Sequence, residues 1–118
     1  MTTSNGYTVN YHFINREPVV KAAYAAILNA VRKFGPVIED PKKTSIHLNR
    51  RTAFAGIATR KAALVLTVKS ESDVNSPRVM RREQVSKKRW HLEIKVDSPE
   101  AVDAEIVSLL EHSYAMSA

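Results

Sequence analysis

The chain has 118 residues, no cysteine, and 18 Lys and Arg against 12 Asp and Glu, which gives a formal net charge of +6. The absence of cysteine excludes disulfides, thiolate metal sites and cysteine nucleophiles, and it favours a reducing, cytoplasmic location. We expect no membrane span and no secretory leader, because no apolar run approaches about 18 residues and the N-terminus has no basic start followed by an apolar stretch.

The positive charge is concentrated in the middle of the chain. Residues 42–95 hold 14 basic and 4 acidic side chains, whereas residues 96–118 hold 5 acidic side chains and no Lys or Arg. This polarity indicates an anionic partner, although a solvated basic surface fits the same pattern equally well.

Residues 1–15 are polar and are expected to form an irregular segment, with the first few residues disordered. A single α+β domain is predicted over residues 16–116. Pro18 suits the first turn of a helix, where its missing N–H is harmless. Apolar residues then recur at helical spacing as far as Phe34, and Gly35-Pro36 ends the pattern. The sequence therefore predicts a helix over residues 18–34.

Three short apolar runs follow at residues 46–48, 53–58 and 62–68, separated by the basic breaks NRRT and TRK. Runs of this length between short polar breaks predict an antiparallel meander of strands joined by hairpin turns. A short edge strand is predicted before it, at residues 37–39. The middle strand is ambiguous, because Phe54 and Ile57 have opposite parity and share a face only if a bulge lies at Gly56.

Residues 70–88 form a long polar connection, with six basic residues between Arg78 and Arg89. A connection of this length in a small domain is usually functional or mobile. Val79, Met80 and Val85 indicate a partly anchored turn of helix or a strand within it.

Apolar and polar residues then alternate from Trp90 to Val96, which predicts a half-buried strand. Ser98-Pro99-Glu100 has the residues of a helix start, with Ser98 as the cap, and an apolar stripe continues the helix over residues 99–114. The predicted fold is an α+β two-layer sandwich: an antiparallel sheet of four to five strands, with the N- and C-terminal helices packed on one face. Leu66 and Ile94 should then be buried under the helices.

Catalytic motifs are missing from the sequence. It contains no glycine-rich phosphate loop, no HExxH and no G-x-S-x-G. By parity His47 and His91 belong to the open face of the sheet, which is the face away from the helices, and Glu93 is the only neighbouring acid. Two histidines need a third ligand or an orienting carboxylate, so surface histidines are favoured over a metal or catalytic site. No catalytic residue, metal or cofactor is predicted.

Basic side chains carry the strongest functional signal, because Arg offers paired donors to phosphate and Lys adds a point charge. Together with the two open-face histidines they form the predicted binding set: Lys43, His47, Arg51, Arg78, Arg81, Arg82, Lys87, Lys88, Arg89 and His91. Trp90 and Phe54 would add stacking surfaces if they faced outward, but Trp90 also fits the core alternation of its strand.

The predicted partner is nucleic acid or another polyanion. The alternative is a homodimerising or protein-interaction module that uses the open face. A third class, an enzyme built around His47, His91 and Arg51, is less favoured.

The ordered motifs FGPV, PKKTSIHL, RTAFAGI, PRV and RWHLEIKVDSPEAVDAEIVSLLEHSY resemble those of the bacterial domain-of-unknown-function family 5655, over about residues 12–116. A more distant resemblance is to the small α/β domains of the YdhG type. The resemblance implies an antiparallel sheet with flanking helices, no assigned catalytic residues, and a binding or accessory role. Some relatives carry a Cys/His zinc knuckle before the first helix, which a chain without cysteine lacks.

Overall fold

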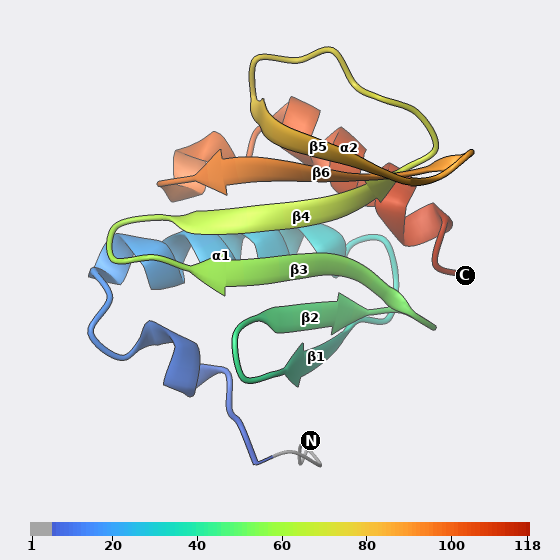
Figure 1. The fold of residues 1–118 in the computed structure, drawn as a ribbon. Coiled ribbons are helices and arrows are strands. Elements are labelled where there is room, and N and C mark those ends of the chain that lie inside the picture. Colours follow the sequence, from blue (N-terminus) through green and yellow to red (C-terminus); the bar gives the residue numbers. More distant parts are fainter. Residues whose placement is uncertain (1–5) are drawn as a thin grey trace.

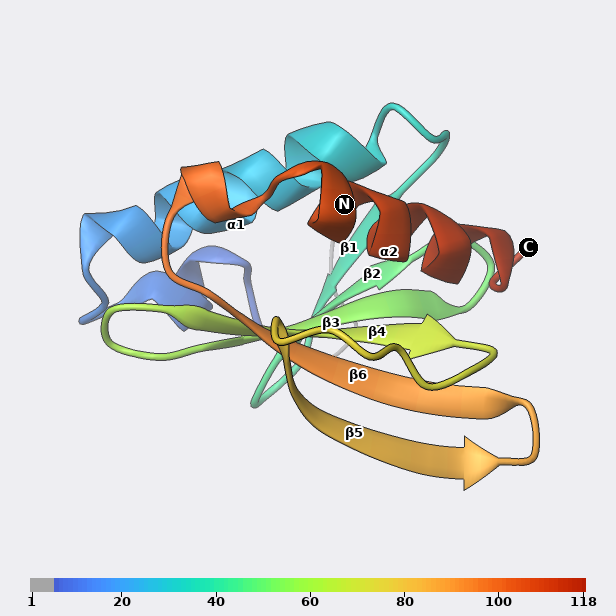
Figure 2. The ribbon, with the colours of Figure 1, turned by 90° about the horizontal axis from the view of Figure 1, so that it is seen from above.

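The computed structural model describes residues 6–118, so the disorder expected for the first few residues lies outside the described part of the chain. In this part, two α-helices lie on one face of a six-stranded antiparallel sheet and leave its other face uncovered (Figures 1 and 2). The predicted α+β two-layer sandwich is confirmed, with six strands rather than four to five.

The strands are arranged in the order β1-β2-β3-β4-β6-β5. In chain order the elements are η1 (Asn10–Phe13), α1 (Pro18–Val31), β1 (Ile38–Pro41), β2 (Ile46–Asn49), β3 (Ala53–Thr59), β4 (Leu64–Ser70), β5 (Val79–Ser86), β6 (Arg89–Val96), η2 (Pro99–Ala101) and α2 (Ala104–Ala115). None of the helices described in residues 6–118 is long and apolar enough to cross a membrane.

The core lies between the helices and the sheet. Ile57, Leu66 and Ile94 are opposed across β3, β4 and β6, and each is 0% exposed. Val20 and Ile27 of α1 join them in one apolar cluster. The predicted burial of Leu66 and Ile94 is confirmed, because alternate residues of a half-buried strand point to the same face.

The additional strand is β5, which lies within the stretch predicted to be a long polar connection. It pairs with β6, yet Val79 is its one buried residue. A strand leaves a pattern in the sequence when one of its faces is buried, and an exposed edge strand has no such face. The strand interpretation of Val79, Met80 and Val85 is therefore correct.

The bulge in β3 lies at Phe54 and not at Gly56. The register changes between the pairs Leu48–Ala55 and Asn49–Ala53, so Phe54 is the extra residue. The Phe54 side chain is 1% exposed and meets the Tyr114 ring edge-on, with centroids 5.1 Å apart. A bulge allows two successive side chains to reach one face, which is why Phe54 and Ile57 are both buried.

The C-terminal helix begins later than predicted. Pro99–Ala101 form the 3-10 helix η2, and Ser98 makes no side-chain capping bond. The Asp103 carboxylate instead accepts the backbone N–H of Ile106 in the first turn of α2. Asp103 is thus the N-cap of α2, because it satisfies a donor that the helix itself cannot satisfy.

Candidate functional site

The strand register identifies the residues that lie on the open face. One row of opposed residues crosses all six strands on this face: Asp40, His47, Gly56, Thr67, Glu93 and Arg81. Its middle members, Gly56 and Thr67, are small and uncharged. The next pairs of the same face are Val65 with Lys95 and Lys69 with His91.

A hollow of about 300 Å³ lies over the centre of this face. Gly56, Ala58 and Thr67 contribute to its lining from β3 and β4, and His47 and His91 line it from either side. The two histidines are three strands apart, or about 14 Å at the usual strand spacing. They share one hollow, but they are too far apart to act together on one atom.

The enzyme and metal hypotheses gain no geometric support from this arrangement. Within residues 6–118, no group of three or more His, Asp and Glu side chains is arranged to hold a metal ion. A proton relay or metal site needs its members within bonding distance, and the nearest partner of His47 across the sheet is a single carboxylate, Asp40.

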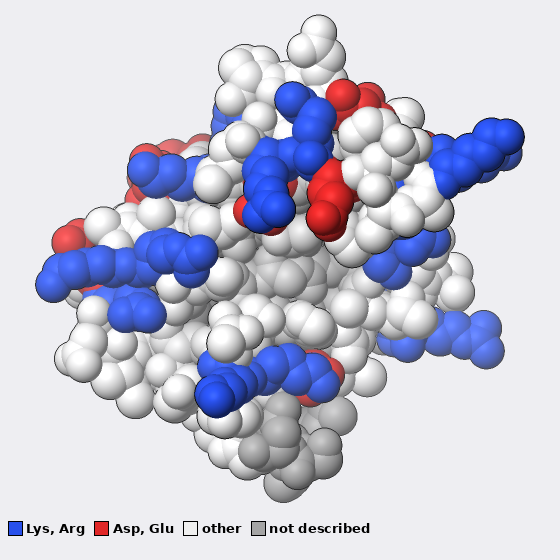
Figure 3. All heavy atoms as spheres, viewed as in Figure 1, with Lys and Arg blue, Asp and Glu red and all other residues white. Residues whose placement is uncertain are grey.

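Lys and Arg form separate groups around the open face, and the centre of the face carries no charge (Figure 3). The strand turns explain this arrangement. Residues 42–45 and 60–63 turn at one end of the strands, which we call the first end. Residues 50–52 and 87–88 turn at the opposite, second end. The basic breaks of the sequence therefore gather at two ends of one face.

Several of these cations are exposed and unpaired. Among residues 6–118, the side chains without a hydrogen bond or ion pair are, at the first end, Lys43, Lys61 and Lys95, and, at the second, Arg51, Lys87 and Lys88. Four of them, Lys43, Arg51, Lys87 and Lys88, belong to the predicted binding set. Unpaired exposed cations are the ones that can meet an anion without first breaking a contact.

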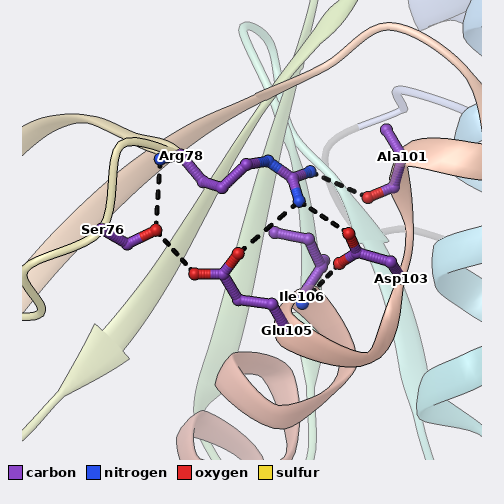
Figure 4. A network of polar contacts seen from close by, with 6 residues as sticks. All are labelled: Ser76, Arg78, Ala101, Asp103, Glu105 and Ile106. Atoms are coloured by element: carbon purple, nitrogen blue, oxygen red, sulfur yellow. Dashed lines mark hydrogen bonds and ion pairs between the residues drawn. The ribbon is translucent and has the colours of Figure 1, made fainter.

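Arg78 has a different environment (Figure 4). Its guanidinium donates to the Asp103 carboxylate and to the Ala101 carbonyl, both at 2.9 Å, and lies 3.7 Å from Glu105. Ser76 donates to Glu105 at 2.6 Å from the same loop. The N–H of Ile106, and then Arg78, hold the pKa of Asp103 below its ordinary value. Arg78 thus joins the β4–β5 loop to the start of α2.

Arg81 and Arg82 are also paired, to different degrees. Arg82 donates to Asp73 at 2.7 Å and to the Val74 carbonyl, which holds the β4–β5 loop against β5. Arg81 lies on the open face 3.8 Å from Glu93 and remains 67% exposed. A long, exposed ion pair contributes little free energy, so Arg81 can exchange its partner at low cost, whereas Arg82 is held more closely.

Arg89 begins β6 and is only partly exposed, and its Nε is buried without a hydrogen-bond partner. It lies near Lys69, whose Nζ donates to Thr52 and Ser117. Burial, and then the charge of Arg89, lower the pKa of Lys69. At the first end, a hydrogen bond from Lys42 holds the pKa of Asp40 below its ordinary value. Lys42, Lys69 and Arg89 are thus less available than the exposed turn lysines.

The two aromatic residues considered for base stacking, Phe54 and Trp90, do not face the open side. Phe54 is in the core, and Trp90 packs against the core cluster in line with Leu92 and Ile94. The core interpretation of Trp90 is therefore the one that the structure supports. Stacking of bases on these rings is not available from the open face.

The comparison with protein families matches residues 9–117 to the family described as "Domain of unknown function (DUF5655)". The chain belongs to this family. The match covers nearly the whole chain and confirms the resemblance found in its ordered motifs. Comparisons with curated proteins and with solved structures found no match. No match bears on the more distant resemblance to YdhG-type domains. Because the family description assigns no activity, the function of this DUF5655 chain has to be argued from its geometry.

Three features of the candidate site were missed from the sequence of this DUF5655 domain. They are the uncharged floor around Gly56 and Thr67, the pairing of Arg78 and Arg82, and the position of Lys61 at the first end. Parity along β3 and β4 could have identified the floor, because Gly56, Ala58 and Thr67 alternate with the buried residues. The pairing of the arginines left no local signal.

Proposed function

We propose that this domain binds a polyanion, in the first place nucleic acid, across the open face of its sheet. The observation that carries the proposal is the position of unpaired Lys and Arg at both ends of the strands, on either side of a hollow whose floor, at Gly56, Ala58 and Thr67, is small and uncharged. A phosphate backbone laid over the hollow would meet basic side chains at each end. Because Phe54 and Trp90 pack in or against the core and no recognition helix lies on this side among the described residues, the contacts would be mainly to phosphates and would not select a sequence.

A protein interface on the open face remains the alternative. Stable protein interfaces usually centre on large apolar or aromatic side chains. Three large apolar residues of the strands are more than 40% exposed, namely Ile38, Met80 and Val85, and all three belong to the edge strands β1 and β5. The centre of the open face has small residues instead, and this favours an anionic polymer over a protein partner.

The experiment is a salt titration of binding to a fluorescently labelled oligonucleotide, followed by anisotropy. If the domain neutralises four to five phosphates, log affinity should fall against log salt with a slope of about −3 to −5. Changing both Lys87→Ala and Lys88→Ala should flatten the slope by about one to two units, with a similar loss for unrelated sequences. Arg89 is left unchanged, because its buried Nε makes its replacement a test of folding as well as of binding.

The matched control removes two charges from the helix side, with Lys21→Ala and Lys33→Ala. Both side chains are exposed, and Lys21 makes one surface hydrogen bond, to Asn10. This control should bind as the wild type does apart from a small effect of net charge. Absence of wild-type binding to single- or double-stranded DNA or RNA at about 50 mM salt and micromolar concentration would refute the proposal.

A further inference from the structure

Across the strands, the open face has acidic residues near both of its edges. In the row that crosses the sheet, Asp40 lies on the edge strand β1, and Glu93 lies on β6 beside the other edge strand. Asp40 is 2.9 Å from Lys42, and Glu93 is 3.8 Å from Arg81. Glu83 of β5 is exposed and lies opposite His91. A polyanion that crossed the strands would meet cations already paired with Asp40 and Glu93, and the carboxylate of Glu83, which is unpaired among the described residues, so this direction is unfavourable.

The direction along the strands has the opposite character. Lys43 and Lys61 lie in the turns of the first end, and Arg51, Lys87 and Lys88 lie in those of the second end. Between the ends, Gly56, Ala58 and Thr67 form an uncharged floor over β3 and β4, and Lys69, near the second end of β4, is the one Lys or Arg among the described residues that line the hollow. β3 has seven residues, so the two ends are about 23 Å apart.

The borders of this floor limit its width. His47 on β2 and Glu93 on β6 are separated by three strand intervals, or about 14 Å. The β5–β6 hairpin bends away from the helix layer and borders the open side (Figure 2). The major groove of a DNA duplex alone is about 12 Å wide, and the whole duplex, which also includes both backbones, is broader than this interval. The hollow is therefore too narrow to hold a duplex, whereas one extended strand fits its width.

We infer that the open face is a channel for a single nucleic-acid strand that runs along β3 and β4, from the Lys43 and Lys61 end to the Arg51, Lys87 and Lys88 end. This inference rests on the proposed function and specifies its partner and direction. Phosphates bind at the two ends and the strand passes over Gly56 and Thr67. DNA and RNA single strands bind alike, because the contacts are to phosphates at the two ends, and Gly56, Ala58 and Thr67 of the floor have no ring on which a base could stack.

Gly56 provides the test, because a side chain can be added there without disturbing the fold. A Cβ at this position would lie 3.9 Å from the Thr67 Cβ, which is ordinary contact, and the backbone angle of Gly56 is not in the region that favours glycine. Gly56→Glu would place a carboxylate in the middle of the channel. The matched control is Ala25→Glu, which adds the same charge at an exposed position of α1, on the other side of the molecule.

The measurement is anisotropy with labelled oligo-dT and oligo-U of about 12 nucleotides, competed by a duplex of the same length. We expect Gly56→Glu to weaken single-strand binding at least about tenfold, Ala25→Glu to change it less than about twofold, and the duplex to compete poorly. Gly56→Gln should weaken binding less than Gly56→Glu, since it adds the bulk without the charge. Circular dichroism of each variant checks that it is folded.

The outcomes separate the two proposals. If the wild type binds but Gly56→Glu binds equally well, or if the duplex competes as strongly as the single strand, the channel is wrong and the binding of polyanions stands. If Ala25→Glu and Gly56→Glu weaken binding equally, net charge accounts for the effect and the channel is again wrong. If the wild type binds no nucleic acid, the proposed function itself fails and the channel fails with it.

Discussion

At the scale of the residue, the contacts of Arg78 differ from those that its position in a basic run predicted. Two acidic residues of the C-terminal segment, Asp103 and Glu105, lie within 4 Å of its guanidinium, and the Ala101 carbonyl accepts a further hydrogen bond from it. Part of the charge separation along the chain is thus neutralised inside the fold. A positive side chain counts toward anion binding only when no acid of the same molecule already holds it.

Arg78→Ala should therefore lower stability more than it lowers polyanion binding. We expect a loss of about 1 kcal/mol in the free energy of unfolding at neutral pH, measured by urea denaturation, with binding within about twofold of wild type. Lys87→Ala, at an exposed turn, should show the reverse pattern. Equal stabilities of wild type and Arg78→Ala would mean that the network in Figure 4 contributes nothing.

The same variant should show a pH dependence. Contacts with Ile106 and Arg78 lower the pKa of Asp103 from the ordinary value of 3.8, so the folded state favours the charged carboxylate. Its contribution to stability is complete above that value and is lost as the pH falls through the lowered pKa of the folded state. The difference between wild type and Arg78→Ala should therefore be constant near neutrality and shrink below about pH 4. A difference that grows on acidification would contradict this assignment.

At the scale of the element, the connection from α1 to β1 packs closely against Tyr114 of α2. Gly35 has a φ of +150°, and a Cβ there would lie 2.5 Å from the Tyr114 hydroxyl. That hydroxyl donates to the Pro36 carbonyl at 3.0 Å, and the Tyr114 ring lies against Phe34 and Phe54. Gly35 thus turns the chain a few residues after α1, which ends at Val31, and it leaves space for the Tyr114 side chain of α2.

Gly35→Ala should destabilise the domain by about 3 kcal/mol, because alanine is strained at this φ and its Cβ meets the hydroxyl. The cost should be smaller in a Tyr114→Phe background, since the ring carbons lie at least 3.5 Å from the added Cβ. Thermal or urea unfolding of the two single variants and the double variant gives this coupling. A cost that is unchanged by Tyr114→Phe would leave backbone strain as its sole cause.

At the scale of the whole molecule, one core connects both layers. Val20 of α1, Leu66 of β4, Leu92 of β6 and Leu110 of α2 belong to a single cluster of buried residues, and Trp90 packs against it. A continuous core is the condition for cooperative unfolding of a small domain.

Unfolding in urea should therefore be a single transition. The far-ultraviolet circular dichroism, which reports mainly on the helices, and the fluorescence of Trp90, which reports on the β5–β6 side of the sheet, should have the same midpoint and slope. A Trp90 transition at lower urea would show that the hairpin opens independently of the core, and would contradict a single cooperative unit.

The amino-acid sequence by itself determined the fold class, the first helix, which the sequence predicts over residues 18–34 and which ends at Val31, the strands of the core and the family. These features depend on periodicity: Leu64, Leu66 and Val68, or Leu92, Ile94 and Val96, record in every second residue which face is buried. Helix ends were located less well: Ser98 has the residue type of a cap but makes no capping bond, Asp103 caps α2 instead, and α1 ends at Val31, before Gly35-Pro36.

Only the tertiary structure decided the remaining features. β5 is a strand because the backbone of β6 is available beside it, and no side-chain pattern records that pairing. The bulge is at Phe54 because Tyr114, 60 residues away in sequence, packs against it. Whether a cation is paired depends in the same way on distant acids: Arg78 meets Asp103, whereas Lys87 and Lys88 meet none among the described residues. Sequence reports the charge of a side chain, but its availability depends on neighbours that folding brings from elsewhere in the chain.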